Sequence, residues 1–77
     1  MSTREERALI ESLERHIATT NDHLDTLRAG LANARRDRDR KLMAFLGGEI
    51  SYYSQQLAQL QAQRAQLAEE YERRRRS

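Results

Sequence analysis

The 77-residue sequence contains no cysteine, no proline and no tryptophan. The lack of cysteine excludes disulfide bonds, thiolate metal sites and thiol catalysis, and it fits the reducing cytoplasm. The lack of proline excludes an architecture in which prolines mark the loops. The length allows only one small domain. We therefore expect a single cytoplasmic domain that is held together by side-chain packing alone.

Long apolar runs are also missing. The longest uncharged stretch, Ile50 to Gln63, is rich in Gln and Ser, so it cannot span a bilayer. No apolar signal-peptide core follows the charged start of the chain. Charged residues make up 34% of the sequence but apolar residues still make up 38%, which leaves room for a small core. We expect a soluble protein without a membrane partner.

The first half of the chain carries one apolar stripe, with spacings that alternate between three and four residues. This period keeps one side of a helix facing a partner helix and predicts a helix over about residues 4–36. The poor helix formers from Thr19 to Asp22 do not disturb the phase, so no break is expected there. The members of this first stripe are Ile10, Leu13, Ile17, Thr20, Leu24, Leu27, Leu31 and Ala34.

The second half repeats the pattern and predicts another helix over about 40–74, with a basic tail at 73–77. When the first stripe is extended by the same rule, it arrives one residue out of step with the second. A break must therefore lie between them. The second stripe consists of Leu46, Ile50, Tyr53, Leu57, Leu60, Arg64, Leu67 and Tyr71.

Two sites compete for the break. Gly47-Gly48 is the strongest helix breaker in the chain, but a turn there makes the helices very unequal. In the charged run from Arg35 to Lys41, Asp37 or Asp39 can cap a new helix, which makes the helices nearly equal. Two glycines inside a helix cost roughly 2 kcal/mol, less than the several leucine burials lost from an overhanging helix. We favour a turn at about 37–39.

The predicted fold is an all-α, two-helix antiparallel hairpin that dimerises into a four-helix bundle. Two helices without a further partner leave each apolar stripe partly exposed to water. The second helix also has few charges, because Arg64 is the only charged residue between Ile50 and Ala68. Alanines beside the second stripe form a smooth strip on which another helix can pack. We assign twelve residues to the core and the dimer: Ile10, Leu13, Ile17, Leu24, Leu27, Leu31, Leu46, Ile50, Tyr53, Leu57, Leu60 and Leu67.

Residues that stand apart from this apolar core carry further expectations. Arg64 lies within the second stripe, so it either snorkels to the edge or pairs with Glu14 or Asp25. Large side chains off the stripe often mark contact hot spots. The candidates for contact with a protein partner are Met43, Phe45 and Tyr52.

The sequence offers no catalytic, metal or cofactor site. His16 and His23 are seven residues apart, which separates them by roughly 10 Å along one helix and prevents chelation. No serine has a histidine at helical spacing, and Gly47-Gly48 lacks the flanking pattern of a phosphate loop. The acidic pairs Glu5-Glu6 and Glu69-Glu70 are interpreted as solvated charges at helix ends. We expect a protein that is not an enzyme.

Basic residues form two clusters at opposite ends of the predicted hairpin, roughly 45 Å apart. They do not form one continuous surface for DNA, and the tail is partly neutralised by the acids of the first helix. The candidate nucleic-acid contacts are Arg35, Arg36, Arg38, Arg40, Lys41, Arg73, Arg74, Arg75 and Arg76.

The segment Leu46-Gly47-Gly48-Glu49-Ile50 resembles the second helix of small phage-type helical-hairpin proteins. The resemblance implies that the glycine pair lies inside a helix, where a neighbouring backbone can come close. In size and heptad content the chain is also similar to the Rop-type hairpin dimers that bind RNA. That similarity implies an arginine face, but acidic residues such as Glu14 and Asp25 would interrupt it.

The function predicted from the sequence is that of a small adaptor or inhibitor, which binds and occludes a protein partner without catalysing a reaction. One alternative is a nucleic-acid-binding regulator that uses the arginine clusters. Another is a structural segment of a larger helical assembly.

Overall fold

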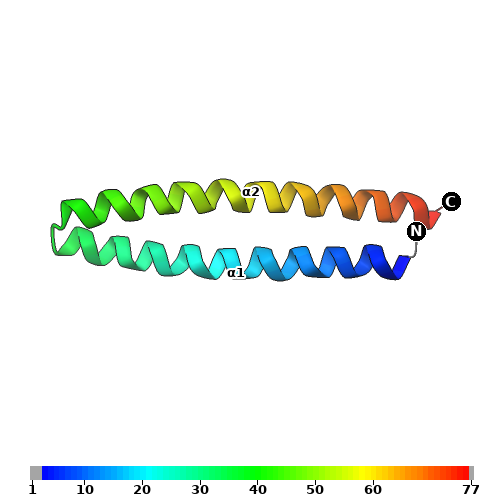
Figure 1. Ribbon diagram of the computed structural model, residues 1–77, viewed down its shortest axis with the longest axis horizontal. Helices are drawn as coiled ribbons and strands as arrows, with labels where there is room; N and C mark the ends of the chain where they lie inside the picture. The colour runs from blue at the N-terminus through cyan, green and yellow to red at the C-terminus, as the bar shows by residue number, and fades with distance from the viewer. Residues whose placement is uncertain (1–2, 77) are drawn as a thin grey trace.

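The computed structural model describes residues 3–76, and the side chains of residues 4–76. Two helices, α1 (Thr3–Arg36) and α2 (Arg40–Arg76), run antiparallel and form a rod whose Cα extents are 58 × 14 × 14 Å (Figure 1). The predicted all-α hairpin is confirmed. The structure contains one copy of the chain, so the predicted bundle of two hairpins stays a prediction. The predicted basic tail reaches residue 77, which lies outside the described residues.

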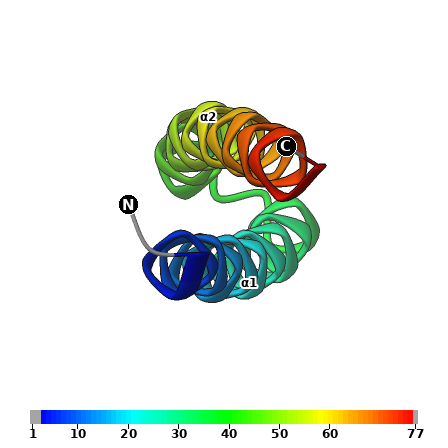
Figure 2. The ribbon, with the colours of Figure 1, turned by 90° about the vertical axis from the view of Figure 1, so that its right-hand side faces the viewer.

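The two helices wind around each other along a single seam (Figure 2). Every residue of both stripes is buried or half-buried. Leu24 is fully buried, and Ala34 and Leu46 are the other buried apolar residues of the described chain. The remaining apolar stripe residues keep part of their surface in water, because each helix has only one neighbour.

The threonine hydroxyl groups in the middle of α1 donate hydrogen bonds to backbone carbonyls of the preceding turn. Thr20, a buried residue of the first stripe, donates its hydroxyl to the carbonyl oxygen of His16 at 2.8 Å. Thr19 makes the same bond to Arg15 at 3.0 Å. These bonds to the preceding turn satisfy the hydroxyls within the helix. As expected from the phase of the stripe, α1 continues through this weakly helical segment without a break.

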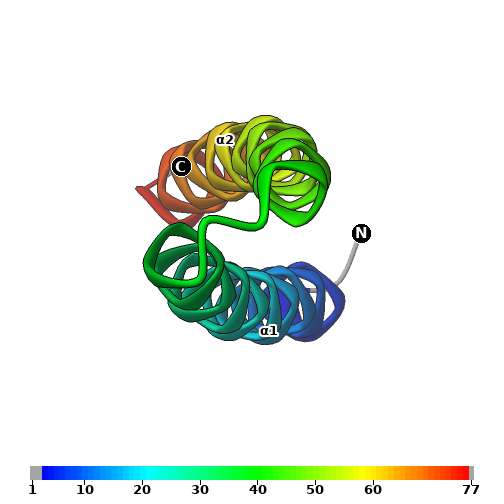
Figure 3. The same cartoon turned by 90° about the vertical axis from the view of Figure 1, so that its left-hand side faces the viewer.

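The chain reverses at Asp37-Arg38-Asp39 (Figure 3). The amide of Asp39 donates to the carbonyl of Ala34 at 2.9 Å, and the amide of Arg38 donates to the carbonyl of Arg35 at 3.2 Å. Together these bonds form a Schellman motif, which normally places glycine where Arg38 lies. Arg38 has a φ of 56°, in the left-handed region that disfavours side chains with a Cβ.

Asp39 begins α2. Its carboxylate Oδ1 accepts a hydrogen bond from the amide of Leu42 at 3.1 Å, and its carbonyl accepts one from Met43 at 2.9 Å. This is the geometry of a helix N-cap. Of the two predicted capping residues, Asp39 therefore holds this position, while Asp37 lies in the turn.

Gly47 and Gly48 both lie inside α2. A Cβ atom added at either position would meet nothing within 4 Å. The close backbone neighbour that we expected at this pair is therefore not supplied by α1. The third glycine, Gly30, is different, because a Cβ there would lie 3.5 Å from Cδ1 of Leu46. Over residues 3–76, neither helix has the combination of length and apolar character needed to cross a membrane.

Candidate protein interaction surface

Three large apolar side chains project from the first half of α2. Leu42 is 42% exposed, Phe45 is 61% exposed and Tyr52 is 55% exposed. Their spacings of three and seven residues place them on one side of the helix over about 15 Å. We call these three residues the apolar ridge. The fourth exposed large apolar residue of the described chain, Leu9, lies near the start of α1, away from the turn.

Aromatic contacts hold one end of the ridge in place. The ring of His23 on α1 meets the ring of Tyr53 edge to face, with centroids 4.6 Å apart. Tyr53 in turn meets Tyr52 edge to face at 5.0 Å. Edge-to-face packing is a favoured arrangement of aromatic rings, so Tyr52 is supported by the seam although half of it faces water.

The three contact candidates predicted from the sequence do not form one patch. Phe45 and Tyr52 belong to the ridge, but Met43 is half-buried. Met43 lies nine residues before Tyr52, which is half a turn around the helix. The sequence analysis overlooked Leu42, although the spacing of Leu42, Phe45 and Tyr52 was available to find it.

Ion pairs tie the two helices together at two points. Arg64, from within the second stripe, lies 2.9 Å from Oε2 of Glu14, one of the two partners proposed for it. Asp25, the other proposed partner, lies 3.7 Å from Arg28 on its own helix. Both side chains of the Glu14–Arg64 pair are between 40% and 50% exposed, so this pair contributes little to stability.

The second ion pair corrects the prediction made for Glu6. We expected a solvated charge at a helix end, but Glu6 is only 5% exposed. The guanidinium of Arg74 lies 2.9 Å from its Oε2, while the buried Oε1 has no hydrogen-bond partner in the described structure. Glu6 lies four residues before Ile10, so it continues the first stripe into the seam. That spacing was the signal in the sequence.

The two basic clusters have different surroundings. In the C-terminal cluster, Arg74 pairs with Glu6, Arg73 lies 3.4 Å from Glu69 and Arg75 lies 3.6 Å from Glu72. At the turn end, five exposed cations surround Asp37 and Asp39, and none of the five forms an ion pair within residues 4–76. We call these five residues the turn cluster: Arg35, Arg36, Arg38, Arg40 and Lys41.

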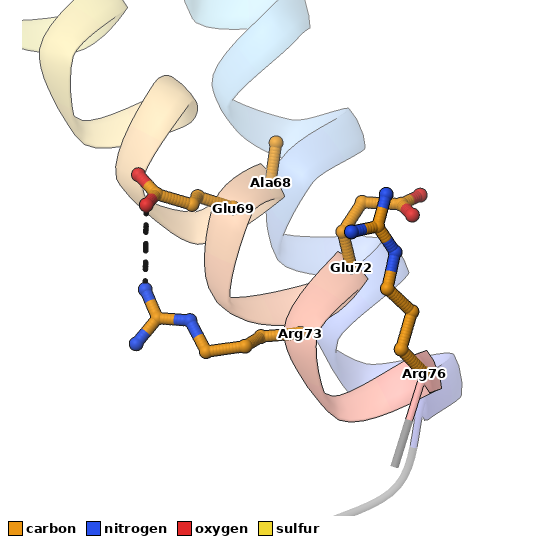
Figure 4. A pocket seen from close by; sticks show the side chains of 5 residues that line it. All are labelled: Ala68, Glu69, Glu72, Arg73 and Arg76. Carbon is orange, nitrogen blue, oxygen red and sulfur yellow. Dashed lines mark hydrogen bonds and ion pairs between the residues drawn. The ribbon is translucent and has the colours of Figure 1, made fainter.

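The described surface includes two shallow hollows. One, of about 490 Å³, is lined only by α2 residues at its C-terminal end, and Arg73 reaches Glu69 along its edge (Figure 4). The other, of about 450 Å³, lies at the seam beside the Glu14–Arg64 pair. Neither lining contains a histidine or a serine.

Neither histidine of the chain is part of a metal-ligating group in the described residues. His16 and His23 are both exposed on α1, and no three metal-ligating side chains of the described chain gather closely enough to hold a metal ion. The contact of His23 is the aromatic one with Tyr53.

Comparison with models of protein families, with curated proteins and with solved structures gives no match for this chain. Its function is therefore inferred from the fold and the surfaces described above.

Proposed function

We propose that the chain is a non-enzymatic interaction module, an adaptor or inhibitor that binds a protein partner through the apolar ridge and occludes it. The observation that carries the proposal is the grouping of Leu42, Phe45 and Tyr52 on one side of α2. Isolated exposed apolar residues are common on proteins, but contiguous ones, especially with aromatic anchors, are typical of protein interfaces.

This function is tested by measuring how much of the partner protein the wild type and two variants capture from the native cell. A ridge variant, F45S/Y52S, is compared with L9S, which removes another half-exposed apolar side chain far from the ridge. We expect wild type and L9S to capture the same partner from the native cell, and the ridge variant to retain at least tenfold less of it. Circular dichroism checks that each variant is helical. If the ridge variant captures the same protein as wild type, the proposed function is wrong.

We also propose that the module works as a homodimer. The chain exposes 6085 Å², whereas a compact protein of 9.0 kDa exposes about 4,900 Å². The surplus of about 1,200 Å² exceeds the roughly 800 Å² that each partner buries in a stable interface of standard size. A second copy would cover the half-buried stripes and convert the hairpin into a four-helix bundle.

The face proposed for the second copy is the uncharged part of α2. Ala58 and Ala62 are exposed within the uncharged stretch from Ile50 to Gln63, and Ala65, also exposed, follows directly after Arg64. Ala65 follows Phe45 by twenty residues, which is about 160° around the helix. This placement leaves the apolar ridge available in the dimer.

Sedimentation tests the dimer. We expect a species of about twice the chain mass for the wild type, and a monomer for A58E/A65E because two buried carboxylates would face the second copy. A wild-type monomer at all concentrations would rule out the dimer. Open-ended oligomers would instead support a structural segment of a larger assembly.

A nucleic-acid-binding regulator is the second candidate, and the unpaired turn cluster is the observation that favours it. Binding to the phosphates of a nucleic acid depends steeply on salt, because the arginine and lysine side chains release the counterions that the phosphates hold. Titration of duplex DNA and structured RNA at increasing salt therefore tests this candidate. An absence of binding at low salt would eliminate it.

A further inference from the structure

The net positive charge of the protein is concentrated at its turn end. The turn cluster and its two aspartates together carry a formal charge of +3, while the whole chain carries +2. The rest of the chain therefore has a net charge of −1. All five cations are exposed, and the carboxylate of Asp39 is engaged in capping α2.

Helix stability does not explain all of these cations. Arg35 and Arg36 lie in the last turn of α1, where the helix dipole favours positive charge. Arg40 and Lys41 lie in the first turn of α2, where the dipole disfavours it, and no acidic residue in that turn compensates. We therefore expect these two cations to reduce the stability of the hairpin.

The apolar ridge begins where the turn cluster ends. Leu42 directly follows Lys41, and Phe45 lies about one turn further along α2. Cations at the tip of the rod (Figure 3) are therefore followed along α2 by exposed apolar side chains as far as Tyr52, with Gly48 and Glu49 between Phe45 and Tyr52.

We propose that this surface binds an acidic, amphipathic helix of the protein partner. The inference rests on the proposed function and specifies the chemistry of the partner. Apolar residues of the partner helix would lie against the ridge, and carboxylates at one of its ends would meet the turn cluster. Such charge complementarity fixes the orientation of the partner and accelerates association.

A protein helix fits this surface better than a nucleic acid does. After Lys41 the next cation on α2 is Arg64, so the ridge offers no contacts to successive phosphates. Half-buried Glu49, between Phe45 and Tyr52, would repel a phosphate backbone that ran along the ridge, whereas a partner helix can keep its carboxylates at the end that meets the turn cluster. Leu42 contributes only apolar surface, which a partner helix can use and a phosphate backbone cannot.

Fluorescence anisotropy with designed peptides tests the inference. The probe is a labelled helical peptide of about three heptads, with leucine at core positions, glutamates gathered in one terminal heptad and glutamine elsewhere. One matched peptide replaces glutamate with lysine, another has the acidic composition in scrambled order, and a duplex RNA of similar length is the fourth probe. Each is titrated with wild-type protein at about 50 mM and about 500 mM salt.

We expect the acidic amphipathic peptide to bind more tightly than the other three probes, and to weaken at the higher salt. R40E/K41E and F45S should each lower its affinity at least about tenfold, whereas L9S should change it less than twofold. R40E/K41E should also raise the melting temperature, because it places acids at the start of α2. Loss of binding by a more stable protein separates recognition from folding, and R40Q/K41Q repeats the test without charge reversal.

Several results would overturn the inference. These are tighter binding of the RNA, equal binding of the lysine or scrambled peptide, no binding of the acidic peptide at low salt, or unchanged affinity of R40E/K41E. Cellular capture separates the two proposals. If F45S/Y52S loses the partner and R40E/K41E keeps it, the acidic helix is wrong and the interaction module stands; if neither loses it, both are wrong.

Discussion

The two ends of the rod carry arginine-rich clusters that look alike in the sequence but differ in the folded protein. At the terminal end, three arginines of α2 lie next to glutamates, and Arg74 reaches across the seam to the buried Glu6. At the turn end, five cations surround two aspartates and form no ion pair within residues 4–76. One cluster helps to hold the helices together, and the other faces solvent.

The difference arises from what the hairpin places beside each cluster. Folding brings the acidic start of α1 against the basic end of α2, so charges distant in sequence become neighbours (Figure 1). The turn cluster has only its own aspartates, and Asp39 is already engaged by the backbone of α2. A run of basic residues is therefore available for binding only where the fold brings no acid to it.

Removal of Arg74 is expected to cause the largest loss of stability. R74A leaves the buried carboxylate of Glu6 without the guanidinium 2.9 Å away. The loss of one partner from a buried ion pair is costly, and because half of Arg74 is exposed we expect about 2 kcal/mol in the free energy of unfolding. Urea unfolding at several protein concentrations measures it. R76A, in the same cluster but without an ion pair within residues 4–76, is the control. Equal losses of stability in the two variants would contradict a special role for the Arg74–Glu6 pair.

The cap at the turn end is expected to contribute less. D39A removes the carboxylate that accepts the amide hydrogen bond of Leu42, and such a loss costs about 1 kcal/mol. The control is D37A, an exposed aspartate of the same turn whose side chain makes no hydrogen bond or ion pair within the described structure. Thermal unfolding of both variants measures the difference. A loss as large in D37A would show that net charge, and not capping, accounts for the effect.

Much of this architecture followed from the sequence, because its causes are periodic or local. The stripes predicted two helices, and their one-residue mismatch required a break between them. The turn lies in the charged run that we favoured, where Asp39 supplies a cap, and the glycine pair is accommodated within α2. Each of these depends on residues close together in the chain.

The features that the sequence did not predict depend on the angle at which α1 and α2 meet. Glu6 is buried because the end of α2 covers it, and Met43 is half-buried because it lies half a turn from the ridge. Residue size selected Phe45 and Tyr52 but also Met43. Size alone does not tell which side of α2 is covered by α1. The positions around the helix would have separated Met43 from the ridge and added Leu42 to it.

A glycine in place of Arg38 is expected to stabilise the turn slightly. The left-handed conformation costs a residue with a Cβ about 1 kcal/mol, but glycine also gains freedom in the unfolded chain. We therefore expect R38G to raise the free energy of unfolding by about 0.5 kcal/mol. R36G, at the last residue of α1, where φ is not positive, is the control and should be destabilising. A loss of stability in R38G would mean that the side chain of Arg38 contributes more than its backbone strain costs.

The smallest expected effect tests the balance of charge within the turn cluster itself. Arg35 lies at the end of α1, where the dipole favours a cation, and Arg40 lies at the start of α2, where it does not. R35Q should therefore lower, and R40Q raise, the free energy of unfolding by about 0.3 kcal/mol each. The two substitutions remove the same charge from the same end of the rod, so general repulsion among the five cations would shift both in the same direction. Opposite signs at low salt that converge at high salt would identify the helix dipoles as the cause and would mark Arg40 as a cation kept at a cost to stability. Equal signs would mean that repulsion dominates, and the distinction between the two sides of the turn would be lost.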